Sequence, residues 1–378
     1  MDNKVLIVGG DHHNTLGVVE SLAEKGIRSF VILITNRKNG YVLHSKYVEK
    51  GWCCSDDEAV VQCIIKNFND TSSKAVVFAT NDHAAAILDK YSTQLTDYIF
   101  IPSTYPYGQL EQWMRKDEMS TLAEQVGLNV PKSWLLVDSE IPDDITYPVI
   151  TKAISSVEGS KSNIHVFNDR DELKSFMASS DRCSKILVQQ YIDKKFEFQL
   201  LGCSLNQGEE VIIPGRTNID RPNGLDNTFF LKFDKYEPEL ESVVETTKQF
   251  IKATRYMGTF SVEFLVSKSG IVYFTEMNFR NDGNAICVTA SGTNIPYIYY
   301  QSLSGGDYAH ELENSKVEQV YLVPEVSYFS RMLAREFGFK EWRRNMKKAN
   351  CYTTFFKKDK RAFLWFLIFA IWKRVYRK

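Results

Sequence analysis

The residues of this 378-residue chain best suited to chemistry are two glutamates, an asparagine and an arginine that lie between residues 263 and 280. Glu276, Asn278 and Arg280 are spaced two apart, so on a β-strand their side chains point to one face. Two apolar, β-branched-rich runs flank the turn sequence Ser-Lys-Ser-Gly at 267–270, which predicts a hairpin. A carboxylate, a carboxamide and a guanidinium are therefore expected on one wall.

The second glutamate joins this wall in one register of the hairpin. Pairing of Val266 with Ile271 places Glu263 opposite Phe274, on the same face as Glu276 and diagonal to it. Like charges among apolar residues are costly unless a cation lies between them, and oxygen ligands of this kind suit Mg²⁺. A one-residue slip would turn Glu263 to the other face. The alternative interpretation is a solvated hairpin face with incidental charges.

This pattern resembles the ATP-grasp superfamily of carboxylate–amine ligases. Glu263, Glu276 and Asn278 look like its metal-binding residues, and 280–284 (Arg-Asn-Asp-Gly-Asn) looks most like the D-aspartate ligase branch and related amino-acid ligases. The resemblance covers residues 1–305 and is strongest from 145 to 300. It implies an α/β and α+β fold, with a Rossmann-like N-terminal domain followed by a two-lobed ATP-grasp domain.

The resemblance also implies an ATP site between the two lobes. The chain has counterparts of the lysines that contact the phosphates and of the small residues in the covering loop. It also has counterparts of the hinge that reads the adenine edge and of the carboxylate that binds the ribose. The implied nucleotide-binding residues are Lys116, Lys152, Glu158, Gly159, Ser160, Gln189, Gln190, Tyr191, Ile192 and Glu197. The alternative for Lys116 and Lys152 is that they are surface lysines. The alternative for the loop at 155–162, which has one glycine, is a plain hairpin turn.

The reaction implied is phosphorylation of a substrate carboxylate by ATP, followed by attack of an amine on the acyl phosphate. ATP and Mg²⁺ are the expected cofactors, with Mn²⁺ as an alternative metal, and the substrates are a small-molecule carboxylate and an amine. Arg280 and Lys152 would absorb the developing charge. Arg216 would hold a substrate carboxylate or the transferring phosphate, or would form a surface ion pair. Residues 281–284 and 289–292 are expected on the acceptor side.

The elements that must position these groups follow from hydrophobic periodicity. Apolar runs at 5–8 and 30–34 flank a helical pattern at 15–25. This βαβ pattern predicts a parallel sheet. His12, His13, Asn14 and Asp82 fall at the carboxyl ends of strands, where they are substrate contacts or, alternatively, loop and capping residues. Further helices are predicted at 111–126 and 239–256.

The predicted domains are a Rossmann-like domain at 1–110, an ATP-grasp domain at 111–305 with lobes of about 111–190 and 191–305, and a C-terminal extension at 306–378. The last 48 residues hold 15 Lys and Arg but 3 Asp and Glu, so the extension is basic although the whole chain has a net charge of −1. Such a split favours an anionic contact. Seven scattered cysteines without metal-ligand spacing predict free thiols. With no signal-peptide pattern, we expect a cytoplasmic protein that does not bind nucleic acid.

An 11-residue apolar run at 362–372 has basic residues on both sides. As a helix it would be about 16 Å long, too short to span a bilayer, but it would suit an anionic membrane surface, helped by a basic helix at 341–348. A helix docked on the protein or on a dimer mate is the alternative, and a homodimer stays open. Membrane attachment would fit a ligase that modifies a lipid-linked glycan, a cell-wall precursor or a surface polysaccharide precursor.

Two other functions compete with the ligase. A membrane-tethered nucleotide-binding protein without activity is disfavoured, because the charged residues of the site are intact. An enzyme that forms carboxyphosphate, like carbamoyl phosphate synthase or a carboxylase, lacks a biotin-carrier or glutaminase segment here.

Overall fold

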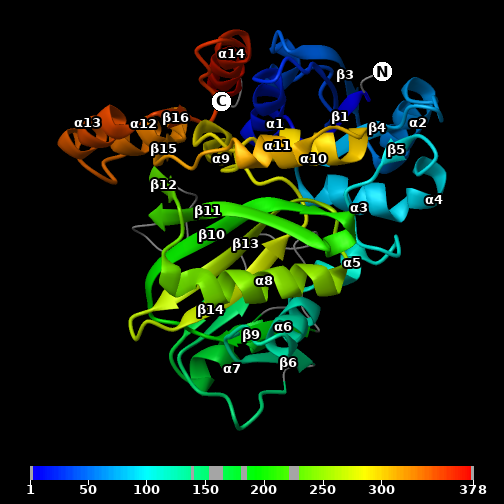
Figure 1. Ribbon diagram of the computed structural model, residues 1–378. Coiled ribbons are helices and arrows are strands. Elements are labelled where there is room, and N and C mark those ends of the chain that lie inside the picture. Colours follow the sequence, from blue (N-terminus) through cyan, green and yellow to red (C-terminus); the bar gives the residue numbers. More distant parts are fainter. Residues whose placement is uncertain (1–2, 138–139, 153–164, 180–184, 221–229, 376–378) are drawn as a thin grey trace.

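The computed structural model describes residues 3–137, 140–152, 165–179, 185–220 and 230–375. Three sheets follow one another in Figure 1, with the N-terminal sheet at the top, a large sheet in the middle and a small sheet at the bottom. This arrangement confirms the expected α/β and α+β fold class. The six described cysteines are free, as expected.

The N-terminal sheet has five parallel strands in the described chain, in the order β3-β2-β1-β4-β5. They span β1 Val5–Gly9, β2 Ser29–Ile34, β3 Val48–Cys54, β4 Ala75–Ala79 and β5 Ile99–Phe100, with helices α1 His13–Ala23, α2 Asp57–Asn67, α3 Asp82–Lys90 and α4 Ser92–Leu95 between them. Strands β1 and β4 are continuous apolar runs, as strands covered on both faces require. Because the strand order reverses between β1 and β4, their carboxyl ends border a ligand-binding position.

The large sheet has seven described strands in the order β14-β13-β10-β11-β12-β15-β16. They span β10 Lys194–Leu205, β11 Glu210–Asp220, β12 Phe230–Asp234, β13 Gly258–Ser267, β14 Val272–Asn278, β15 Val320–Val323 and β16 Cys351–Tyr352. Helix α8 Glu241–Thr254 crosses one face of this sheet (Figure 1). Strands β15 and β16 carry the sheet beyond residue 305, and the predicted domain limits stay predictions.

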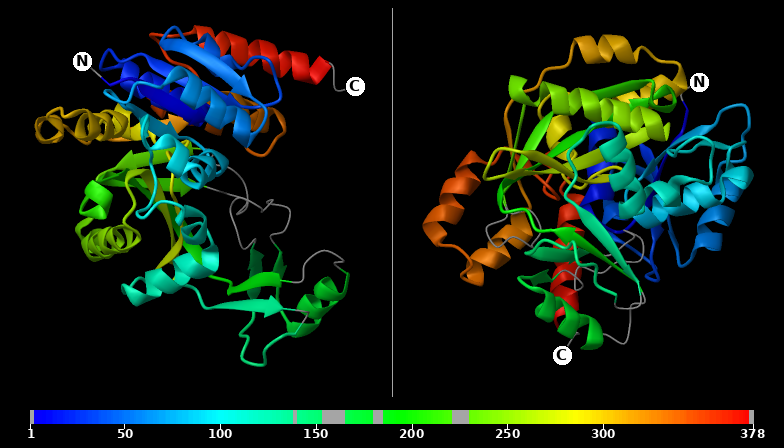
Figure 2. Two further views of the ribbon diagram at one scale, coloured as in Figure 1. Left: turned by 90° about the vertical axis from the view of Figure 1, so that its right-hand side faces the viewer. Right: turned by 90° about the horizontal axis from the view of Figure 1, so that it is seen from below.

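The small sheet is antiparallel, with described strands in the order β6-β9-β7-β8. It comprises β6 Ser133–Val137, β7 Val149–Lys152, β8 Val166–Phe167 and β9 Lys185–Gln190, with α7 Arg170–Ser179. Its apolar side chains form a core of their own, which includes Trp134, Leu136, Val149 and Leu173. Figure 2 shows this lobe set apart from the rest of the molecule.

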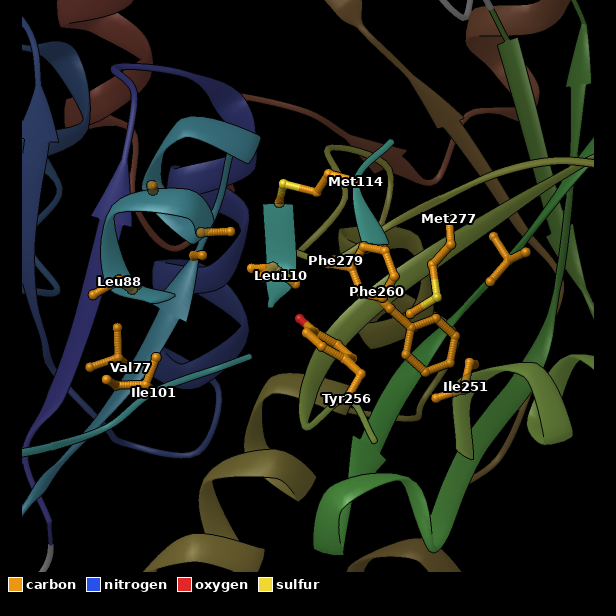
Figure 3. Packing of buried hydrophobic residues seen from close by; sticks show 14 of the residues in the cluster. Val77, Leu88, Ile101, Leu110, Met114, Ile251, Tyr256, Phe260, Met277 and Phe279 are labelled. Atoms are coloured by element: carbon orange, nitrogen blue, oxygen red, sulfur yellow. The ribbon is translucent and has the colours of Figure 1, made fainter. Parts of the chain in front are cut away.

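A continuous hydrophobic core joins the N-terminal sheet to the hairpin β13–β14. Figure 3 shows residues of the N-terminal part on one side, α5 in the middle and the hairpin with the end of α8 on the other. Its labelled members are Val77, Leu88, Ile101, Leu110, Met114, Ile251, Tyr256, Phe260, Met277 and Phe279. The hairpin that carries the candidate site is thus packed against the N-terminal sheet.

The helix predicted at 111–126 is in fact two helices, so that prediction was wrong. Helix α5 Leu110–Trp113 ends before Arg115, whose backbone is extended, and α6 Lys116–Gln125 begins there. Met114 before the break and Met119 after it are both buried in the core, so each piece packs separately, and tertiary context overrides helical periodicity. The break makes Lys116 the first residue of α6.

The C-terminal part continues with helices that pack on the other face of the N-terminal sheet or extend from the body. They are α9 Ile286–Ala290, α10 Ile295–Ser304, α11 Tyr308–Glu313, α12 Glu325–Leu333, α13 Phe339–Lys348 and α14 Arg361–Val375. No helix in the described part of the chain has the length and apolar character needed to cross a membrane.

Helix α14 contains the apolar run at 362–372 and docks on the N-terminal part. The ring of Trp365 stacks on His44 with a centroid distance of 3.9 Å, and Phe366 meets Tyr41 edge-on at 5.0 Å. The alternative of a helix docked on the protein therefore holds for this face of α14.

A buried carboxyl pair lies where the C-terminal extension meets α1. Glu20 accepts from Ser45 Oγ at 3.4 Å, and the nearby Asp359 accepts from the backbone N–H groups of Lys46 at 2.8 Å and Arg361 at 3.1 Å. Burial, followed by repulsion from Asp359, raises the pKa of Glu20 to about 8.

The raised pKa of Glu20 predicts that the contribution of this residue to stability falls between about pH 4.5 and 8. In that range the native state holds a proton that the unfolded state has released, so the free energy of unfolding falls as the pH rises. Glu20→Gln is expected to flatten this dependence and to raise the free energy of unfolding at pH 8 by on the order of 3 kcal/mol. Urea unfolding at pH 5 and pH 8 measures both effects, and equal pH slopes in the two proteins would contradict the assignment.

Candidate active site

The hairpin places Glu263 and Glu276 directly opposite each other. Phe264 pairs with Phe274 and Glu263 with Glu276, so Thr275 is an extra residue in β14. The Thr275 hydroxyl donates to the backbone oxygen of Glu263 at 2.9 Å.

The predicted register was wrong by one residue. Val266 pairs with Val272 rather than with Ile271, and Glu263 does not lie opposite Phe274. The irregularity at Thr275 acts as a β-bulge and reverses the effect of the slip, which is why both glutamates still share a face. The two carboxylates are closer neighbours than the diagonal arrangement implied.

Each of these carboxylates contacts a polar group from another element. Lys116 Nζ, at the start of α6, lies 3.0 Å from Glu276 Oε2. Gln199 Nε2, on β10, donates to Glu263 Oε1 at 2.9 Å, and Asn284 Nδ2 donates to Gln199 Oε1 at 3.0 Å. Lys116, as the first residue of α6, thus brings an ammonium group to the glutamate pair.

Arg280 is held by acidic groups from two parts of the chain. Its Nη1 lies 3.1 Å from Asp282 Oδ2, its Nε lies 3.3 Å from Asp82 Oδ1 at the start of α3, and its Nη2 donates to Asn278 Oδ1 at 3.0 Å. Burial on its own would lower the pKa of Arg280, but Asp82 and Asp282 outweigh it and the pKa is raised. The guanidinium is a fixed positive charge at the end of β14.

The donor set on this wall fits Mg²⁺. Two opposed carboxylates supply the hard oxygen ligands that Mg²⁺ prefers when substrate phosphates complete its coordination, and Asn278 Oδ1, which accepts from Arg280 Nη2, has a second lone pair for the metal. Among the described residues, no three His, Cys, Asp or Glu side chains form a self-sufficient metal site. A shared protein–phosphate site is the arrangement that these residues can support.

Gln189 and Gln190, two residues of the predicted adenine hinge, end strand β9 of the small sheet. The backbone N–H groups of Gln190 and Tyr191 donate to Lys132 O and Pro148 O, at 2.8 and 3.0 Å, so both are committed to the lobe. Gln189 is buried, and its Nε2 donates to Ser133 Oγ at 3.0 Å. The structure therefore turns the Gln189 amide into the small sheet.

The remaining predicted nucleotide residues are placed in part. Tyr191 is exposed and Ile192 is buried at the end of β9, while Glu197 pairs with Lys194 at 2.5 Å at the start of β10. Lys152 ends β7, and its side chain lies outside the described residues. Glu158, Gly159 and Ser160 also lie outside them, so their contacts with nucleotide stay predictions.

Arg216 is engaged by protein groups in a buried position. Its Nε and Nη2 both donate to the carboxylate of Glu237, its Nη1 donates to Asn218, and it lies over the rings of Phe196 and Phe198. The ion pair of the alternative is present in this structure, but Arg216 is buried rather than at the surface. A contact of Arg216 with substrate stays a prediction.

The N-terminal residues singled out from the sequence meet the segment that follows β14. Asn14 Nδ2 donates to Asn281 O at 2.5 Å, and Asn281 Nδ2 donates to Asn14 Oδ1 at 2.6 Å. His12 caps α1, as the capping alternative proposed. Burial, with a smaller contribution from His12, lowers the pKa of His13 to about 3, so its ring is neutral at pH 7.

Three contributors to the site were missed or misread in the sequence. Glu197 and Gln199 alternate with Phe196 and Phe198 in one strand, and this alternation was a usable signal. Asp282 was assigned to the acceptor side without its link to Arg280. Asp82 was read as a substrate contact or a cap, but the cap of α3 is Asn81 and Asp82 pairs with Arg280.

Comparison with known proteins gives a family match over the middle of the chain. Residues 116–303 match the family described as carbamoyl-phosphate synthase L chain, ATP binding domain. The carbamoyl phosphate synthase large chain of Thermoanaerobacter sp. (strain X514) is 26% identical over 195 residues. That match covers 48% of this chain and 17% of the relative, so the chain spans about a sixth of the relative's length.

Solved structures resemble nearly the whole chain in fold. L-amino acid ligase from Bacillus licheniformis has a TM-score of 0.66 at 17% identity, covering 85% of this chain and 79% of that one. N5-carboxyaminoimidazole synthetase from Staphylococcus aureus has a TM-score of 0.66 at 13% identity, covering 90% and 88%. Biotin carboxylase from Campylobacter jejuni has a TM-score of 0.65 at 17% identity, covering 84% and 74%.

Proposed function

Because the chain has the ATP-grasp fold, we propose that it is an ADP-forming ligase that joins a carboxylate to an amine through an acyl phosphate. The observation that supports this most directly is the opposed pair Glu263 and Glu276, with Lys116 3.0 Å from one member and Asn278 beside them. Opposed carboxylates, an ammonium group and a carboxamide on one wall are the groups that a shared site for Mg²⁺ and substrate phosphates requires.

The residues of the site would divide the work between positioning and charge neutralisation. Glu263, Glu276 and Asn278 would hold Mg²⁺, or Mn²⁺, and the bound metal would draw charge from the phosphate oxygens. Lys116 and Lys152 would contact phosphates as point charges. The substrate carboxylate attacks the γ-phosphorus and ADP leaves. The amine then attacks the acyl carbon, loses a proton and expels phosphate.

Arg280 would stabilise the acyl phosphate at the end of β14. Asp82 and Asp282 fix its guanidinium in place, so little reorganisation is needed as negative charge develops on the transferring phosphate. We place the amine acceptor between Arg280 and the N-terminal domain, on the side of the neutral His13 ring and the Asn14–Asn281 pair.

The finer assignment is an amino-acid ligase of the D-aspartate ligase type that acts on a cell-wall or surface-polysaccharide precursor. A solved neighbour named as an L-amino acid ligase and the segment 280–284 support an amino-acid substrate. A cytoplasmic location, at the inner face of the membrane, agrees with the need for ATP and with the free cysteines. A homodimer is part of the same proposal.

Formation of carboxyphosphate from bicarbonate is the second candidate. The family profile matched by residues 116–303 is that of carbamoyl-phosphate synthase, and a biotin carboxylase is among the structural neighbours. In this case bicarbonate takes the place of the substrate carboxylate while the nucleotide site is unchanged.

The test is ADP and phosphate release by the full chain with ATP and Mg²⁺. Separate arms contain pooled amino acids with amines and sugar acids, bicarbonate with the same amines, and no added substrate. ADP release that needs both an organic carboxylate and an amine supports the ligase. Release that needs bicarbonate transfers the assignment to the second candidate, and ATP binding without turnover in every arm rejects both.

A further inference from the structure

The most exposed large apolar side chains of the described residues are concentrated on three C-terminal helices. Leu333 is 63% exposed, Phe339 59%, Leu364 56%, Ile368 51% and Phe329 44%, while large apolar residues elsewhere in the described part reach 43%. Single exposed apolar residues are ordinary, but a cluster of this kind marks a contact surface. Three of the five lie on α12 and α13.

The α12–α13 hairpin presents these side chains as one patch. Phe329 and Leu333 are one helical turn apart and share a face of α12. The rings of Phe329 and Phe339 lie 5.8 and 5.6 Å from the ring of Trp342. We call Phe329, Leu333, Phe339 and Trp342 the apolar patch.

The hairpin is anchored firmly enough to present this patch as a unit. Tyr328 is buried beneath it, and its hydroxyl accepts from Asn345 Nδ2 at 2.7 Å. At the start of α12 the carboxylate of Glu325 accepts from the backbone N–H groups of Thr353 and Thr354, each at 3.0 Å. Figure 1 shows α13 at the edge of the molecule, away from the hairpin β13–β14.

A basic face lies next to the apolar patch. At about 100° per residue, five exposed cations of α13 fall within an arc of about 140° that begins beside Phe339. They are Lys340, Arg343, Arg344, Lys347 and Lys348. The helix carries a single acidic residue, Glu341.

We propose that the α12–α13 hairpin docks this protein on an anionic lipid bilayer, with the apolar patch at the acyl boundary and the basic face on the headgroups. A helix with one strongly basic face and aromatic or aliphatic residues beside it is suited to lie in the plane of such an interface. A nucleic acid would use the cations, but it would gain nothing from burying the aliphatic Leu333. The charge pattern and the exposed aliphatic chain together select the bilayer.

This docking surface differs from the one expected from the sequence, which centred on residues 362–372. Among the described side chains of α14, the aromatic face contacts His44 and Tyr41, whereas Leu364 and Ile368 are exposed on its outer edge. The α12–α13 hairpin is therefore the principal contact. The proposal goes beyond the ligase function and does not depend on it.

Vesicle flotation of the full-length protein tests the proposal. Vesicles of phosphatidylcholine alone are compared with vesicles that contain about one quarter phosphatidylglycerol. We expect binding to the anionic vesicles that weakens as the salt concentration rises. Arg343→Gln with Arg344→Gln should lower the partition coefficient about 25-fold, at about fivefold per charge. Leu333→Ser with Phe339→Ser should lower it at least about tenfold.

Matched controls separate docking from general charge and from misfolding. Lys66→Gln with Lys174→Gln removes two exposed charges far from the hairpin in sequence and should leave partitioning within about twofold. Leu364→Ser with Ile368→Ser tests α14 and should have the smaller effect. Thermal unfolding of each variant shows that the body is intact. No vesicle binding, equal binding to neutral vesicles, an unchanged partition coefficient in both hairpin variants, or retention on an anionic polymer without vesicle binding would overturn the proposal.

Discussion

Replacing Glu276 with glutamine is expected to lower the rate of ADP release by at least about 100-fold while leaving the protein folded. The substitution keeps the shape of the side chain but removes one of two opposed carboxylates, and with it the charge that pairs with Lys116 at 3.0 Å. Because like charges directly opposite each other on a hairpin are unfavourable, the free energy of unfolding should stay within about 1 kcal/mol of its original value or rise. Steady-state ADP release and urea unfolding measure the two effects.

Glu245→Gln is the matched control for this experiment. Glu245 lies on α8 in an ion pair with Lys248 across one helical turn, where such pairs contribute a few tenths of a kcal/mol. It should change neither rate nor stability appreciably. A Glu276→Gln protein with normal turnover would show that the glutamate pair is not the metal–phosphate site, whereas a large loss of stability would show that Glu276 has a structural role.

Replacing Arg280 with methionine is expected to abolish turnover and also to destabilise the protein by about 3–5 kcal/mol. The guanidinium lies between Asp82 and Asp282, and its removal would leave these carboxylates partly buried without their shared cation. Arg280→Lys keeps the charge, but a compact ammonium cannot replace a planar fork that reaches Asp82, Asp282 and Asn278 together. Turnover should therefore fall about 100-fold in the lysine variant, with a smaller loss of stability.

Arg28→Met is a suitable control because Arg28 forms an exposed ion pair with Glu49 at 2.8 Å. Exposed pairs of this kind contribute about 0–1 kcal/mol, so its free energy of unfolding should change by no more than that. If Arg280→Met and Arg28→Met proved equally mild, the buried acidic clamp around Arg280 would be refuted. Equal turnover of the lysine variant and the original protein would refute the need for a fork-shaped cation.

Several features of the site were accessible from the sequence because they depend on short-range patterns. The spacing of Glu276, Asn278 and Arg280 places their side chains on one face of any strand that contains them, and a turn sequence between two apolar runs is a local hairpin signal. The βαβ pattern before residue 35 likewise predicted the parallel sheet. In each case the period of the side chains and the chemistry of the turn are set by neighbouring residues.

Other features required the assembled chain. The extra residue at Thr275 restores Glu263 to the active face in a register that the sequence could not specify. The helix expected at 111–126 breaks at Arg115, and residues on both sides of the break, Met114 and Met119, pack into the shared core. Both outcomes depend on packing between distant segments, and periodicity along one segment does not report it.

By itself, the sequence determined which groups this protein could bring to a reaction: paired carboxylates, a carboxamide and a fork-shaped cation on one strand face, together with a basic, apolar C-terminal extension. Only the tertiary structure decided which groups meet. It joined Asp82 to Arg280, Lys116 to Glu276, and Asn14 to Asn281 across 267 residues. It also buried one face of α14 while leaving Phe329, Leu333 and Phe339 of α12 and α13 exposed. The physical reason is that side-chain identity and alternation are local properties, whereas ion pairing and burial depend on which surfaces the shared hydrophobic core brings together.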